Sequence, residues 1–159
     1  MGVLIYNFLG LDYLNRYLFC LALFLVPFDY LSADNLAQAN SSIEIFANVS
    51  VVDEKYTLAD VRAIFAMRKT RWHDGQKIQV FVLPDNSPLH RQFTKSKLNM
   101  FPHQFRRIWD RLIFSGIGQG PQEVESMEEM QKKLASVPNA VGYLKAPINN
   151  KNIRVLNYE

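Results

Sequence analysis

The stretch of sequence that decides the fold is TLADVRAIFAMRKTRWHDGQKIQVFVLPDNSPLHRQF, residues 57–93. Thr57 with Asp60 is a variant of the helix-capping box, and the apolar residues that follow recur at the spacing of one helix face. The residues Trp72–Gly75 form a turn that breaks this helix. Ile78–Leu83 is rich in β-branched and aromatic residues, which predicts a mostly buried strand. The stretch therefore predicts the order helix, turn, strand, polar turn, helix.

The polar turn after this strand is the best candidate for a binding site. Ser87 can cap the next helix, with Pro88 as the first helical residue. Free backbone N–H groups at a helix start favour anions. We therefore predict a small-oxyanion site built from four residues: Asn86, Ser87, His90 and Arg91. The alternative is an N-cap serine followed by solvated side chains.

The flanking sequence completes one α/β unit. A first strand is predicted within Ser42–Val52, and the strongest helix pattern of the chain begins at Pro102. This helix carries an apolar stripe at helical spacing, predicted to be buried: Phe105, Ile108, Trp109, Leu112 and Ile113. Its opposite side carries three arginines that form a basic face: Arg106, Arg107 and Arg111. Trp72 and Trp109 are predicted to be core anchors.

The last part of the chain supplies the remaining elements. A glycine-rich loop at 115–121 ends the long helix, and a short strand is predicted at 122–125. Ser126 caps a further helix, buried through apolar residues at helical spacing. Two strands follow, at 140–144 and 153–156, the second at the edge of the sheet.

A series of residues from about Ser42 onward follows the order found in one known family. They are Leu58, Ile64-Phe65, Trp72-x-x-Gly75, Ser87, Phe93, Trp109, Gly116 and Pro138–Tyr143. This order resembles the second lobe of the phosphate-type periplasmic substrate-binding proteins of ABC transporters. The resemblance implies an α/β fold, a single three-layer lobe like one domain of a type 2 periplasmic-binding protein. It also implies a non-enzymatic binding role outside the cytoplasm, with phosphate or a related small oxyanion as ligand and a transporter protein as partner.

The predicted oxyanion turn departs from the pattern of that family. The family reads Arg-x-x-x-Ser-Gly-Thr, whereas the corresponding residues here are Leu83, Ser87, Pro88 and Leu89. Only the serine is kept, and proline has no N–H to donate. Met67 stands where the family usually has a glycine that ends a helix.

Two hypotheses about function follow from this comparison. In the first, the chain is a solute-binding component that captures a small oxyanion, with a second copy in a homodimer supplying the missing lobe. In the second, it is a cell-envelope interaction module that keeps the fold without a ligand. The family resemblance favours the first hypothesis, and the altered turn favours the second.

The N-terminal residues carry the pattern of a secretory signal. Tyr17–Phe28 is an apolar run shorter than the roughly 20 residues that span a bilayer. Small residues follow and allow cleavage after Ala33 or Ala39. We predict a signal peptide at 1–39, a periplasmic-binding-protein-like domain at 40–159 and a periplasmic location. The alternative is an inner-membrane anchor formed by an uncleaved leader.

The charge balance favours anionic partners. The chain has 18 basic and 15 acidic residues, and removal of residues 1–39 leaves 17 and 12. This excess does not distinguish phosphate from cell-wall polymers or lipid headgroups. Nucleic acid is not predicted as a partner, because the chain carries an export signal and no nucleic-acid-binding motif. The basic face of the long helix is a candidate surface for an acidic envelope protein.

No pattern predicts a metal, a cofactor or catalysis. The histidines His73, His90 and His103 follow no metal-ligand spacing, and the one cysteine, Cys20, lies in the predicted leader. The glycines at 116–120 follow a helix, whereas phosphate-loop glycines follow a strand. The sequence also lacks a Gly-x-Ser-x-Gly nucleophile motif. We therefore predict a protein that is not an enzyme.

Overall fold

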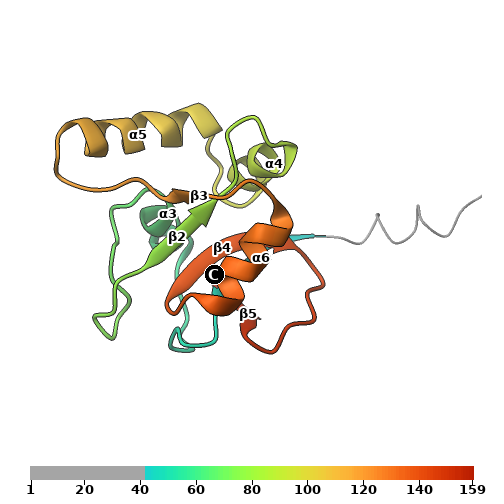
Figure 1. Ribbon diagram of the computed structural model, residues 1–159. Coiled ribbons are helices and arrows are strands. Elements are labelled where there is room, and N and C mark those ends of the chain that lie inside the picture. Colours follow the sequence, from blue (N-terminus) through green and yellow to red (C-terminus); the bar gives the residue numbers. More distant parts are fainter. Residues whose placement is uncertain (1–41) are drawn as a thin grey trace, which may run out of the picture. The chain divides into compact units, whose positions relative to one another are not determined.

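A five-stranded mixed sheet runs through residues 42–159, which are the residues that the computed structural model describes (Figure 1). Its strand order is β3-β2-β4-β1-β5. The strands are β1 (Ile43–Asn48), β2 (Gln79–Val82), β3 (Gln122–Glu123), β4 (Ala140–Lys145) and β5 (Ile153–Val155). β1 is antiparallel to both β4 and β5, whereas β2 is parallel to both β4 and β3. The predicted leader lies outside the described residues.

Four helices of this part of the chain cover the two faces of the sheet. They are α3 (Leu58–Phe65), α4 (Pro88–Ser96), α5 (Pro102–Phe114) and α6 (Met127–Ser136). α6 lies on one face, and α3, α4 and α5 lie on the other (Figure 1). The predicted three-layer α/β lobe is therefore confirmed. No helix within residues 42–159 has the length and apolar composition needed to cross a membrane.

Two adjacent residues of β4 show how the layers meet. A Cβ atom placed on Gly142 would lie 2.6 Å from the Sδ atom of Met130, so the missing side chain lets α6 approach the sheet closely. Tyr143 points to the opposite face, because successive side chains of a strand alternate. Its ring stacks on Phe93 of α4, with the ring centroids 3.8 Å apart. Both layers of helices are thus fixed at neighbouring positions of one central strand.

The predicted helix starts are confirmed by their hydrogen bonds. In α3, the N–H of Asp60 donates to the Thr57 hydroxyl at 3.1 Å, and the N–H of Thr57 donates to the Asp60 carboxylate at 3.1 Å. Ser87 and Ser126 cap α4 and α6 in the predicted way. Met67 follows α3 with a φ of 57°, in the left-handed region that favours glycine. This backbone conformation explains why the phosphate-type family usually has a glycine at this position.

Both tryptophans are buried, as predicted. Trp72 is 3 % exposed and its Nε1 donates to the carbonyl of Asn139 at 3.2 Å. Trp109 is 2 % exposed and its Nε1 donates to the carbonyl of Phe65 at 2.9 Å. Ile113 is a correction to the predicted stripe, because 49 % of it is exposed. It lies in the last turn of α5, and a Cβ atom placed on Gly120 of the following loop would lie 3.1 Å from its Cδ1.

Candidate functional site

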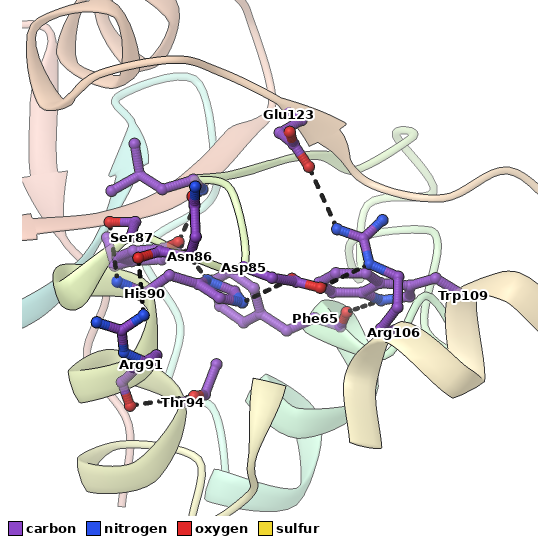
Figure 2. Close-up of polar contacts among 12 residues, drawn as sticks. Phe65, Asp85, Asn86, Ser87, His90, Arg91, Thr94, Arg106, Trp109 and Glu123 are labelled. Atoms are coloured by element: carbon purple, nitrogen blue, oxygen red, sulfur yellow. Dashed lines mark hydrogen bonds and ion pairs between the residues drawn. The ribbon is translucent and has the colours of Figure 1, made fainter. Parts of the chain in front are cut away.

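The turn between β2 and α4, with the first residues of α4, contains the four predicted oxyanion residues (Figure 2). The Ser87 hydroxyl accepts the N–H of His90 at 3.4 Å, as an N-cap does. Asn86 is exposed, and its carbonyl accepts a hydrogen bond from Nη1 of Arg91 at 2.7 Å. The structure therefore brings the four residues to one helix start, but the Arg91 guanidinium folds back on the turn.

His90 is the buried member of the four, with 1 % of its side chain exposed. Its Nδ1 lies 2.6 Å from the Tyr143 hydroxyl, which also accepts the N–H of Leu83 at 2.8 Å. A phenol has one proton to give, so we infer that Tyr143 donates it to Nδ1 and that neutral His90 carries its own proton on Nε2. The imidazole thus holds the turn from inside the fold.

Asp85 continues this chain of contacts to the surface (Figure 2). One carboxylate oxygen, Oδ1, lies 3.6 Å from Nε2 of His90, and Oδ2 accepts from Nε of Arg106 at 2.8 Å. Arg106 also donates to Glu123 of β3 at 3.2 Å. These hydrogen bonds, that to Asp85 above all, raise the pKa of Arg106. This series of contacts connects the start of α4 to β4, α5 and β3.

The position of Arg106 corrects the predicted basic face. Its guanidinium lies 5.2 Å from the centre of the Trp109 ring and pairs with two carboxylates. Of the three arginines, Arg107 and Arg111 are exposed, and Arg106 is half-buried. The reason is that the helix turns Arg106 toward the sheet edge, where Asp85 and Glu123 lie.

His90 makes folding stability depend on pH. Burial, the largest effect, lowers the pKa of His90 below its ordinary value of 6.5, while Asp85 opposes this shift. The unfolded chain therefore takes up this proton first as the pH falls. Between 6.5 and the lower pKa of the folded state, the unfolded state binds more protons, so the free energy of unfolding decreases with falling pH.

Denaturant unfolding between about pH 7.5 and 5 measures this effect. We expect the His90→Gln variant, which stays uncharged over this range, to lose less stability on acidification than the wild type. The exposed His73 and His103 are present in both proteins and cancel in the comparison. Equal pH slopes for wild type and variant would contradict the assignment.

Ser87 also borders a groove of about 310 Å³ between the starts of α4 and α6. The N-cap of α6, Ser126, lies on the other side of this groove, and Lys145 contributes a cation from the end of β4. Glu125 adds one carboxylate. Two helix N-termini directed at one groove favour an anion there. We call this the α4–α6 groove.

The charge around the two helix starts favours an anion more on the α4 side of the α4–α6 groove. The first turn of α6 carries Glu128 and Glu129, which already balance its positive dipole end. The first turn of α4 has no acidic residue. Sequence reasoning found Ser87 but missed Lys145 as a site residue, because the two are far apart in the chain and meet only through the sheet.

The described residues offer no metal centre. Within residues 42–159, no group of three or more histidine, cysteine, aspartate or glutamate side chains is placed to hold a metal ion.

Comparison with known proteins places this fold. No family model matches the chain, and no curated protein does. An ABC-type phosphate transport receptor from Vibrio cholerae superposes with a TM-score of 0.56 at 15 % identity, over 74 % of this chain and 46 % of that one.

Two further solved structures are similar to the same degree. A putative phosphate ABC transporter substrate-binding protein from Clostridium perfringens, with bound phosphate, has a TM-score of 0.59 at 14 % identity, over 74 % of this chain and 45 % of its own. PstS from Borrelia burgdorferi has a TM-score of 0.56 at 12 % identity, over 80 % and 54 %. The chain thus spans about half the length of these proteins. At such identities the likeness shows the fold, which is that of one lobe of a phosphate-type substrate-binding protein.

Proposed function

We propose that this chain is an exported, non-enzymatic binding domain that holds a small oxyanion such as phosphate in the α4–α6 groove. The observation that carries the proposal is that Ser87 caps α4 at the carboxyl end of β2 and borders a groove that also contains Lys145. Ligands of open α/β sheets bind outside the carboxyl ends of the strands. The bound phosphate of the Clostridium perfringens protein supports the choice of ligand class.

Three donors line the α4–α6 groove. The Ser87 hydroxyl accepts one hydrogen bond and keeps its own proton to donate. The N–H of Leu89 has no acceptor within residues 42–159, and Pro88 has no N–H. Lys145 makes no ion pair in the same part of the chain. A hydroxyl, an amide and an ammonium are a small donor set, so the proposed affinity is weak.

The other residues of the predicted site have supporting roles in this proposal. Asn86 and Arg91 close the turn through their hydrogen bond, and Arg91 adds positive charge at its exposed side. His90 fixes the first turn of α4 from below, through Tyr143.

Ser87→Ala should weaken phosphate binding by roughly 1 kcal/mol, about fivefold, because one hydrogen bond to a charged ligand is lost. Isothermal titration calorimetry of the purified protein measures this change. Lys145→Gln should also weaken binding and flatten its dependence on salt. Ser87→Thr keeps the cap and the hydroxyl, and should keep most of the affinity.

Lys95→Gln is the matched control for the lysine. Lys95 belongs to α4, but its Nζ lies over the Phe101 ring at 5.1 Å and not in the groove. We expect unchanged binding. Equal affinity of the wild type and Ser87→Ala would place the anion elsewhere.

A second function, that of an interaction module without a small ligand, is favoured by one specific observation. Arg91 already donates to the Asn86 carbonyl at the surface, and His90 lies against Tyr143 inside the fold, so the turn lacks a free guanidinium. The partner would then be a transporter, another envelope protein or a second copy of this chain. No heat of binding with millimolar phosphate or sulfate, together with co-purification of an envelope protein that is lost on changing Arg107 and Arg111, would support this function.

Export is the remaining part of the proposal, and it rests on the apolar run Tyr17–Phe28 and the small residues after it. Mass spectrometry of periplasmic protein should find a new N-terminus at Asp34 or Asn40. The intact chain in the membrane fraction would indicate an uncleaved anchor, and the intact chain in the cytoplasm would contradict export.

A further inference from the structure

We propose that the loop after α5 docks this protein on an anionic membrane surface. Phe114, the last residue of α5, is 87 % exposed, and Ile117 in the following loop is 81 % exposed. Ile113 beside them is 49 % exposed. Removal of large apolar side chains from water is favourable, and here three of them lie within five residues. We call Ile113, Phe114 and Ile117 the apolar tip; it covers the end of α5 and the start of the loop that leads to β3 (Figure 1).

Unpaired cations lie beside the apolar tip. Ile117 borders a groove of about 610 Å³ that also contains Arg68 and Lys77, and no acidic residue lines this groove. Within residues 42–159, neither Arg68 nor Lys77 makes an ion pair. Two cations without an ion pair and without an acidic neighbour in the groove therefore lie next to exposed apolar side chains.

α5 adds to this charge. Arg107 and Arg111 are exposed, about two turns and one turn before the end of α5, and neither forms an ion pair among the described residues. Asp110 is the one acidic residue of the helix. The surface around the apolar tip thus keeps a positive excess.

Charge and shape together favour a membrane as the occupant. Phe114 and Ile117 are too exposed to line a closed pocket, but they suit insertion among lipid headgroups. Each basic residue near an anionic lipid surface adds attraction, and the groove beside Ile117 has room for a headgroup. This surface lies at the start of β2, whereas Ser87 follows its end. Docking therefore leaves the α4–α6 groove free, and the two proposals are independent.

Vesicle co-sedimentation tests the docking surface. The protein is residues 40–159, which contain the described core from Ile43 to Leu156 and the compact unit Ser41–Glu159. It should bind vesicles of phosphatidylglycerol and phosphatidylcholine, and bind pure phosphatidylcholine vesicles much more weakly. The double variant Phe114→Ser/Ile117→Ser should lower binding at least about tenfold, through the lost apolar burial. Arg68→Gln/Lys77→Gln should lower it about tenfold or more and flatten its salt dependence.

Two substitutions of similar kind serve as controls. Val49→Ser changes an apolar residue that is 50 % exposed outside the tip, and Lys151→Gln removes an exposed cation outside the groove. Neither should change vesicle binding. The proposal is overturned if the wild type does not bind the anionic vesicles. It is also overturned if both double variants bind them as tightly as the wild type does. Binding of an acidic polypeptide through these residues without vesicle binding would also overturn it.

Discussion

Replacing Trp109 by alanine is expected to lower the free energy of unfolding by about 3–5 kcal/mol. The ring is 2 % exposed, and its Nε1 donates to the buried carbonyl of Phe65 at 2.9 Å. The truncation therefore leaves both a cavity and an unpaired acceptor. Denaturant unfolding measures the loss. Phe114→Ala in the same helix is the control, because that ring is 87 % exposed and should contribute little.

Trp109 also matters for the site. The guanidinium of Arg106 lies over its ring and holds Asp85, which in turn faces His90. Loss of the ring should therefore loosen the start of α4 as well as the core. A destabilisation well under 1 kcal/mol would mean that α5 packs differently and that this support for the turn does not exist.

Replacing Gly142 by valine is expected to cost about 1–3 kcal/mol. Its Cβ would lie 2.6 Å from Sδ of Met130 and 3.5 Å from the Phe81 carbonyl oxygen, and Met130 is itself fully buried. The buried Met130 side chain has little room to move away, so the sheet and α6 must separate. Thermal or denaturant unfolding measures the change.

Gly118→Val is the control for this substitution. A Cβ at Gly118 would meet only the Leu112 side chain, at 3.9 Å, which is ordinary contact. We expect a small effect there. Equal losses at the two glycines would mean that close approach of α6 does not govern stability.

Local signals explain which parts of the fold were predictable from the sequence. Thr57, Ser87 and Ser126 act on N–H groups three residues away, so short patterns reveal these helix starts. The order of the strands is different. β1 lies between β4 and β5, and its pairing joins residues about a hundred positions apart, which no local pattern encodes. For that part, the prediction rested on the resemblance alone.

The site was predictable at Ser87 and much less so around it. His90 resembles a free polar residue near a helix start, but the fold places Tyr143 of β4 against it. A helical pattern of Leu89, Phe93 and His90 as one buried face was the available signal. Lys145 gave no signal, because a cation at the end of a strand joins a groove only when the neighbouring helix starts are in place.

A phosphate titration followed through the backbone amide resonances of the protein tests the central claim most directly. We predict saturable shifts at Ser87, Leu89 and Lys145, which line the α4–α6 groove, and none at Arg68 or Ile117. The Ser87→Ala variant should lose these shifts, and the Lys95→Gln variant should keep them. Amide shifts that do not saturate up to about 50 mM phosphate, or that cluster outside this groove, would contradict an oxyanion site at the start of α4.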